Sequence, residues 1–189
     1  MTTTDSLSNP GRLPPFEEDD ADRLVVIVET PKGSRNKYDF DPEARLFELS
    51  KVLPAGMAFP YDFGFVPSTL ADDGDPLDVL VLMDEPAFVG CRLSCRLVGI
   101  IEGEQEDKKK GKATRNDRLV CVESGNHSFN YVRRIDDLGS QFEEEIAQFF
   151  VNYHGLDGSR YRILGVKGPA QALRQVKICM KNHRKHNKR

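Results

Sequence analysis

The sequence lacks the features of membrane-embedded, secreted and disulfide-stapled proteins. It contains no run of about 18 apolar residues, so a membrane-spanning helix is not expected. The first 22 residues have neither a basic n-region nor an apolar core and do not look like a secretory signal. The four cysteines include no CxxC pair. We therefore expect reduced, packed thiols in a cytoplasmic protein.

The sequence also lacks a strong excess of positive charge. It has 27 basic and 30 acidic residues and a formal net charge of −3, so nucleic acid is not an expected partner. The charge is unevenly distributed, because residues 177–189 hold six Lys and Arg and no acid. Taking these six charges from the net −3 leaves −9 for the rest of the chain. An acidic body of this kind suits divalent cations.

The apolar pattern predicts one domain between two polar ends. Residues 1–22 contain an acidic cluster and three prolines, which indicates a disordered or loosely attached arm. Residues 23–176 hold the apolar segments, and residues 177–189 form a basic tail. Short β-branched or alternating segments predict strands at 24–28, 37–40, 79–82, 91–101, 118–122 and 161–166.

Two helices are expected in the second half of the chain. Apolar residues between 142 and 153 recur on one helical face and predict a helix near 140–154, with Ser140 and Glu143 as a capping box. Pro169 opens a final helix. Several short strands with two helices predict an α+β, mainly β fold, a small barrel or strongly curled sheet with helices on its flank.

Residues 54–78 combine frequent turn residues with large aromatic side chains. Seven prolines and glycines punctuate this stretch, which argues against a long helix or a central strand. Four aromatic side chains nevertheless lie between 59 and 65. An irregular segment with such side chains must be pinned to a core, and pinned loops often carry functional sites.

The clearest chemical signal is the acidic run at 72–78, Asp-Asp-Gly-Asp-Pro-Leu-Asp, directly before an apolar strand. Four carboxylates this close repel one another unless cations lie among them. The glycine and proline shape the loop so that Asp73, Asp75 and Asp78 are able to converge, and carboxylate-only ligation suits Mg²⁺ or Mn²⁺. An exposed acidic turn without a function is the alternative interpretation.

Beyond these features, the sequence resembles the soluble family I inorganic pyrophosphatases. The resemblance is carried by residues 61–70, YDFGFVPSTL, and above all by residues 73–81, DGDPLDVLV, a highly specific pattern. It extends from about Leu24 to about Val176. It implies an OB-like, five-stranded curled barrel with two flanking helices, Mg²⁺ as cofactor (Mn²⁺ is possible) and hydrolysis of pyrophosphate to two phosphates.

The resemblance also implies roles for individual residues. Asp73 and Asp78 would ligate metal, and Asp75 would accept the proton of a metal-bridging water. The remaining metal-site positions are Glu29, Asn116 and Asp117. Lys37 and Tyr153 would hold phosphoryl oxygens. The other positions that correspond to substrate-binding residues of the family are Lys51, Arg118, His154 and Phe63.

The chain departs from the family pattern at several of these positions. A phenol, an arginine and two lysines of the family are replaced by Phe63, Lys51, Arg118 and His154, respectively. Two family carboxylates become the amides of Gln105 and Asn116, which weakens metal ligation, and Asp117 is one nearby acid that could compensate. We expect His154 at the surface near its helix end.

Two interpretations of function follow. The first is a divergent enzyme that hydrolyses pyrophosphate or a related phosphoanhydride, since a water activated by divalent cations, a carboxylate base and cations around the phosphoryl oxygens are sufficient for this chemistry. The second is a catalytically weak or inactive protein of the same fold that binds phosphate compounds or a protein partner. A homo-oligomer, a trimer or hexamer, is expected although Gln148 and Asn152 replace the family's interface histidines.

Overall fold

A computed structural model describes residues 9–107 and 111–187. The outermost parts of the expected arm and tail, residues 1–8 and 188–189, lie outside the described residues. In chain order the elements are η1 (Pro10–Arg12), β1 (Arg23–Thr30), β2 (Asn36–Asp41), β3 (Leu46–Val52), β4 (Asp62–Val66), β5 (Leu77–Leu82), β6 (Arg92–Asp107), β7 (Lys112–Arg115), β8 (Arg118–Glu123), η2 (Ile135–Leu138), α2 (Gly139–Gly155), β9 (Ser159–Lys167) and α3 (Pro169–His186).

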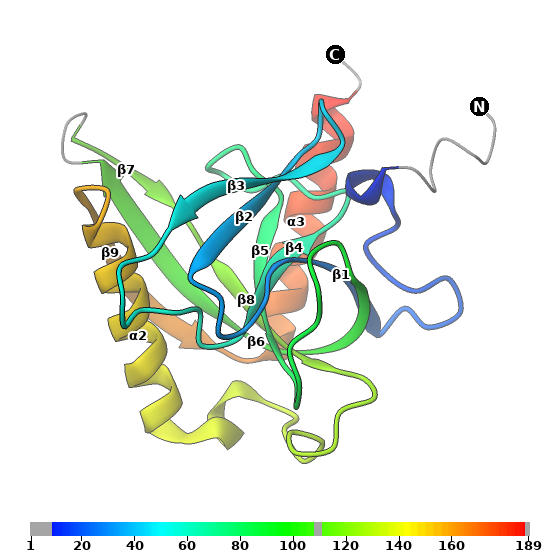
Figure 1. The fold of residues 1–189 in the computed structure, drawn as a ribbon. Helices are drawn as coiled ribbons and strands as arrows, with labels where there is room; N and C mark the ends of the chain where they lie inside the picture. Colours follow the sequence, from blue (N-terminus) through cyan, green and yellow to red (C-terminus); the bar gives the residue numbers. More distant parts are fainter. Residues whose placement is uncertain (1–8, 108–110, 188–189) are drawn as a thin grey trace.

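Five of the described strands close into a barrel. Hydrogen-bonded neighbours follow the order β1-β4-β5-β8-β6, and β6 pairs back onto β1. These pairings are antiparallel except for β5–β8, which is parallel. The expected mainly β, OB-like five-stranded barrel is confirmed, and α2 and α3 lie on its flanks (Figure 1).

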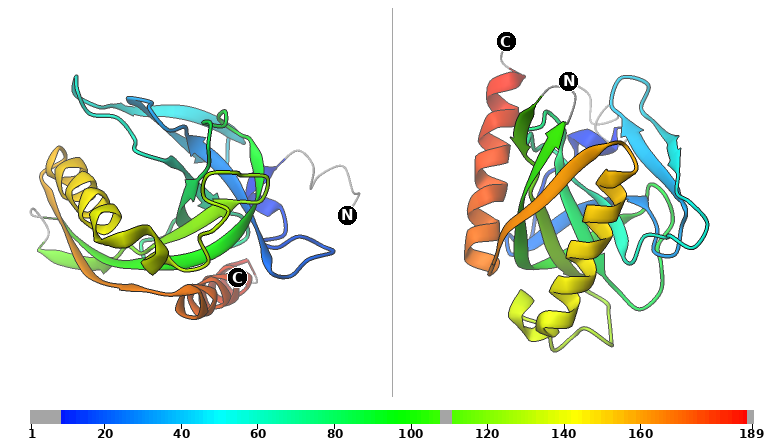
Figure 2. Two further views of the ribbon diagram at one scale, coloured as in Figure 1. Left: turned by 90° about the horizontal axis from the view of Figure 1, so that it is seen from below. Right: turned by 90° about the vertical axis from the view of Figure 1, so that its left-hand side faces the viewer.

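Alternation along the strands places the two helices on different sides of the barrel wall. Side chains on a strand point alternately to opposite faces, and β5 illustrates the result. Leu80 belongs to an apolar cluster with Phe150 of α2, whereas its neighbour Val79 belongs to a cluster with Val176 of α3. Strands β1 and β5 are nearly continuous apolar runs because both of their faces are covered. Figure 2 shows the two helices on different sides of the sheet.

Strands β2 and β3 form a separate two-stranded sheet beside the barrel. Phe40 of β2 stacks on Phe65 of β4 with ring centroids 5.6 Å apart, and Phe47 of β3 lies 5.1 Å from Phe40. This aromatic contact docks the hairpin on the barrel. It also fixes the position of Lys37, which precedes Phe40 on the same strand.

Strand β4 corrects the expectation that residues 54–78 contain no central strand. Asp62–Val66 is fully buried and pairs with β1 on one side and β5 on the other. The sequence analysis counted Gly64 as a residue that interrupts strands, but Gly64 is what allows β4 to lie between β1 and β5. A Cβ there would lie 2.0 Å from the carbonyl oxygen of Ile27, so only glycine lets β1 approach this closely.

Helix α2 is confirmed, but its expected capping box is wrong. The helix begins at Gly139, and the N-cap residue Leu138 makes no side-chain cap hydrogen bond. The physical reason is that η2 leads directly into α2, with Leu138 already in the right-handed helical region at φ −83° and ψ −14°. Ser140 and Glu143 therefore lie inside the helix.

Both ends of the described chain pack on the barrel. Phe16 bridges to Leu24, and the N–H of Val25 donates to the carbonyl of Pro15 at 2.9 Å. At the other end α3 runs on through residues 177–186, and Cys179 within this stretch is buried. No helix among the described residues is both long and apolar enough to cross a membrane.

Candidate active site

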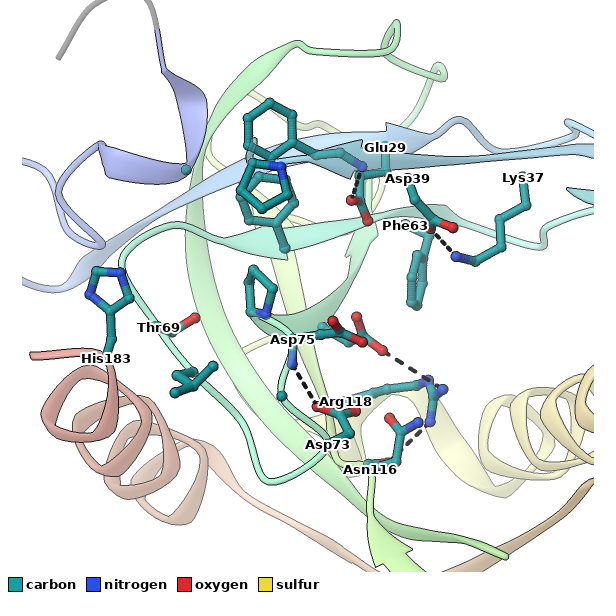
Figure 3. A pocket seen from close by; sticks show the side chains of 18 of the residues that line it. Glu29, Lys37, Asp39, Phe63, Thr69, Asp73, Asp75, Asn116, Arg118 and His183 are labelled. Carbon is teal, nitrogen blue, oxygen red and sulfur yellow. Dashed lines mark hydrogen bonds and ion pairs between the residues drawn. The ribbon is translucent and has the colours of Figure 1, made fainter. Parts of the chain in front are cut away.

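A cavity of about 1040 Å³ opens where the barrel, the β2–β3 hairpin and the ends of both α-helices meet. Asp73 and Asp75 lie in the middle of the cavity, with His183 on one side and Lys37 on the other (Figure 3). Residues near both ends of the described chain, Asn9 and Asn187 among them, also border it. The cavity therefore joins segments that are far apart in the sequence.

The acidic loop predicted from sequence forms one wall of this cavity. Asp73, Asp75 and Asp78 all line it. The loop is anchored to α3, since the N–H of Leu70 donates to the carbonyl of Cys179 at 3.0 Å. Within the loop, Asp73 accepts a hydrogen bond from the backbone N–H of Asp75 at 3.2 Å. The turn is thus held in place at its base and its tip.

Burial makes these carboxylates reluctant to ionise. Burial is the main reason that the pKa of Asp78 rises to about 7, against the opposing effect of Arg118. Burial likewise raises the pKa of Glu29, on β1, to about 8, although the carboxylate accepts a hydrogen bond from the N–H of Phe40 at 2.8 Å. Burial also raises the pKa of Asp73 and Asp75. Such carboxylates need cations nearby to carry full charge.

The donor chemistry of the wall fits a hard divalent cation. Its acidic lining supplies oxygen atoms only, as Mg²⁺ and Mn²⁺ prefer. The side-chain Oδ1 of Asn116 is a further buried oxygen, and it has no partner among the described residues. However, the described residues contain no group of three or more His, Cys, Asp or Glu side chains that lie close enough together to hold a metal ion. Repulsion between neighbouring carboxylates opposes such gathering.

Lys37, Phe63 and Tyr153 line the cavity as their predicted substrate-binding role requires. Lys37 forms an ion pair with Asp39 on the same strand. Lys51 is not part of the cavity lining. It pairs with Asp157 and lies over the ring of Tyr153, with its Nζ 4.6 Å from the ring centroid.

Arg118 is the most deeply buried cation at the site. It begins β8, its side chain is 3% exposed, and it lines the cavity. Its Nη2 lies 3.7 Å from Asp78, and its Nη1 donates to the carbonyl of Asn116 at 3.1 Å. The guanidinium therefore counteracts the negative charge of the acidic loop.

The two amides at the predicted metal positions bond to each other. The Nδ2 of Asn116 donates to the Oε1 of Gln105 at 2.9 Å, and both residues line the cavity. Asp117, proposed as a compensating acid, is not in the lining. It accepts from the N–H of Gly103 at 3.0 Å and pairs with Arg115 at 2.9 Å. Its carboxylate thus fixes the β6–β7 hairpin.

His154 is buried, not at the surface as expected from its place near the helix end. Only 4% of it is exposed, and its Nε2 lies 3.2 Å from Nη2 of Arg118. Burial, reinforced by the charge of Arg118, lowers the pKa of His154 to about 3. The residue is therefore a neutral imidazole, and interaction with a helix dipole through a positive charge does not apply.

Several residues of the cavity escaped the sequence interpretation, Thr69 and His183 among them. Thr69 donates to the carbonyl of Val66 at 2.6 Å and accepts from the N–H of Leu77 at 2.9 Å, so it closes the base of the acidic loop. No sequence pattern marks that role. His183 was assigned to the tail, but it follows Val176 and Cys179 at helical spacing, and this spacing was an available signal.

Comparison with known proteins gives the same result from three directions. The family model described as inorganic pyrophosphatase matches residues 26–184. An inorganic pyrophosphatase from Synechocystis sp. is 40% identical over 161 residues, which cover 85% of this chain and 92% of that protein. The crystal structure of inorganic pyrophosphatase from Thermus thermophilus has a TM-score of 0.83 and 32% identity, covering 93% of this chain and 99% of that one. For a crystal structure of an inorganic pyrophosphatase from Neisseria gonorrhoeae the TM-score is 0.81, with 28% identity and coverage of 91% and 96%. By its sequence and by its fold, this chain belongs to the inorganic pyrophosphatase family.

Proposed function

We propose that the protein hydrolyses inorganic pyrophosphate to two phosphates with the help of Mg²⁺. The observation that carries the proposal is the cavity in which acidic residues of one loop face the cations Lys37 and Arg118. A small, highly charged anion needs such cations on its oxygens, and phosphoryl transfer depends mainly on positioning and charge stabilisation. The names of the relatives support the choice of pyrophosphate as substrate.

The acidic residues divide into metal ligands and a base. In the proposal Asp73, Asp78 and Glu29 hold the divalent cations, with Asn116 as a neutral oxygen ligand. Bound Mg²⁺ lowers the pKa of coordinated water and neutralises charge on the phosphoryl oxygens. Asp75 accepts the proton of the attacking water, and burial together with the charge of Asp39 raises the pKa of Asp75, which makes it a better base.

The remaining polar residues bind and orient the substrate. Lys37, Arg118 and Tyr153 donate to phosphoryl oxygens in this proposal. Burial raises the pKa of the Tyr153 hydroxyl, so the phenol stays protonated and acts as a donor. Lys51 lies outside the cavity lining, pairs with Asp157 and packs over the ring of Tyr153, so in this proposal it supports Tyr153 and does not contact the substrate. Phe63 supplies an apolar wall that contributes no hydrogen bond.

Phosphate release from pyrophosphate tests the proposal directly. We expect turnover with Mg²⁺, none in the presence of a chelator, and a loss of about 100-fold or more in kcat for Asp75→Asn, because a general base contributes about 10²–10⁴-fold. Asp72→Asn is the matched control, since Asp72 carries the same charge next to the site but does not line the cavity. Equal activities of the two variants would refute the role of Asp75.

Two observations favour a second candidate, a phosphate-binding protein with little or no activity. Arg118 already lies 3.7 Å from Asp78, and the Gln105–Asn116 pair offers amides in place of carboxylates. Folded protein that binds phosphate but releases none from pyrophosphate, with either Mg²⁺ or Mn²⁺, would support this alternative and exclude the first.

We further propose a cytoplasmic homo-oligomer. The four cysteines are free thiols, and three of them are buried, as suits a reducing compartment. Exposed apolar side chains on β3, among them Leu46, Leu49 and Val52, offer area for contact between copies. Light scattering on the purified protein decides between a monomer and a trimer or hexamer.

A further inference from the structure

The guanidinium of Arg118 packs against two aromatic rings. Its central carbon lies 4.0 Å from the ring centroid of Phe150 and 4.7 Å from that of Tyr161. Tyr161 is itself fixed, since its hydroxyl donates to the carbonyl of Asn116 at 3.1 Å. These contacts restrict a flexible side chain before any ligand arrives.

Polar contacts at Nη1 and Nη2 then fix the orientation of the guanidinium. Nη1 donates to the carbonyl of Asn116 at 3.1 Å, and Nη2 lies 3.2 Å from the Nε2 of His154. Arginine is a donor only, so Nε2 of His154 must be the acceptor and the imidazole must be neutral. The His154 ring is parallel to that of Tyr161, with an interplanar angle of 11° and centroids 4.9 Å apart. The imidazole is thus as firmly placed as the guanidinium it contacts.

These contacts leave donors on Arg118 unused. A guanidinium has five N–H groups, and the Nη1 and Nη2 contacts with Asn116 and His154 account for two of them. Asp78, at 3.7 Å, is beyond hydrogen-bond distance. The residue lines the cavity, so the remaining Nη donors are available to a phosphoryl oxygen there. His154 by contrast has its Nε2 committed to Arg118.

We propose that His154 is a positioning residue that holds the Arg118 guanidinium toward the phosphoryl oxygens of the substrate. The inference rests on the proposed function, and it replaces the direct contact with substrate that was expected of His154. Preorganisation is the physical gain, because a cation already fixed in its binding orientation loses less side-chain entropy when the anion binds. The competing explanation is that His154 and Arg118 only fill the space beside Asp78.

A double-mutant cycle on ligand affinity separates the two explanations. The probe is methylenediphosphonate, a pyrophosphate analogue that is not hydrolysed, titrated calorimetrically with Mg²⁺ present. His154→Phe keeps a ring to stack on Tyr161 but removes the acceptor, and His154→Gln removes the ring but restores an acceptor oxygen. Arg118→Lys keeps the charge but loses the planar group. Thermal melts confirm that each variant is folded.

We expect His154→Phe to weaken binding about 10-fold, as loss of a hydrogen bond to a charged group predicts. His154→Gln should recover most of that loss, and His154→Phe should have no further effect in the Arg118→Lys background. An unchanged affinity of His154→Phe, or an equal loss in both backgrounds, would overturn the positioning role. If the wild-type protein does not bind the probe at all, the proposed function fails, and the inference falls with it.

Discussion

At the scale of single residues, burial is the largest cause of the pKa shifts at this site. Glu29 and Asp78 have pKa values raised to about 8 and about 7, and in both cases burial is the largest cause. The same cause acts with the opposite sign on His154, whose pKa falls to about 3, because its charged form is the cation. In each of these residues, burial favours the neutral form.

The neutral state of His154 has a consequence for stability. Its pKa is about 3 in the folded protein and about 6.5 when unfolded, so the unfolded chain takes up the proton first. The stabilisation is complete above pH 6.5 and is lost as the pH falls toward 3. Between pH 7.5 and 5 the wild type should therefore lose about 2 kcal/mol more unfolding free energy than His154→Gln. Urea unfolding at both pH values measures this difference, and parallel losses in the two proteins would contradict the buried neutral state.

The carboxylates that line the cavity were predictable from the sequence, but their surroundings were not. The pattern at 73–78 identified Asp73, Asp75 and Asp78, because repelling carboxylates in a short loop are informative on their own. The burial of His154 was not predictable, since it depends on β8 and β9 folding against the end of α2. It was also not predictable that Asp117 lies outside the cavity lining, because its carboxylate bonds to the β6–β7 hairpin.

At the scale of elements, the close approach of β1 to β4 at Gly64 has the clearest consequence for stability. We expect Gly64→Ala to lower the unfolding free energy by about 3 kcal/mol or more, because its Cβ would lie 2.0 Å from a backbone oxygen of β1. Gly155→Ala is the matched control, since a Cβ there meets nothing within 4 Å, and it should change stability by less than about 1 kcal/mol. Chemical denaturation decides, and a Gly64→Ala protein as stable as the wild type would mean that β1 and β4 are able to separate.

Elements with strong periodicity were the predictable ones. Helix α2 and the strands β1, β5, β8 and β9 appear where apolar spacing placed them. Strand β4 did not, because its glycine is a local breaker that tertiary contact turns into a requirement. The start of α2 was also predicted wrongly. The helix continues directly from η2, so no capping side chain marks its first residue.

At the scale of the whole molecule, we expect Mg²⁺ to stabilise the fold through the acidic loop. A ligand at about 100 times its dissociation constant adds about 2.7 kcal/mol, which at this chain length corresponds to a rise in Tm of about 5–10 °C. Asp73→Asn should reduce this rise, whereas Asp72→Asn, outside the cavity lining, should retain it. Melting curves with Mg²⁺ and with a chelator provide the measurement. A wild-type Tm that does not respond to millimolar Mg²⁺ would refute metal binding at this loop.

The cavity also has a practical consequence for anyone who handles the protein. Its border includes Asn9 and Gly11 at one end of the described chain and His186 and Asn187 at the other. An affinity tag joined to the chain within a few residues of Asn187 would lie close in sequence to this border, and a polyhistidine tag would bring metal-chelating imidazoles with it. Kinetic constants and metal titrations are therefore best collected after proteolytic tag removal.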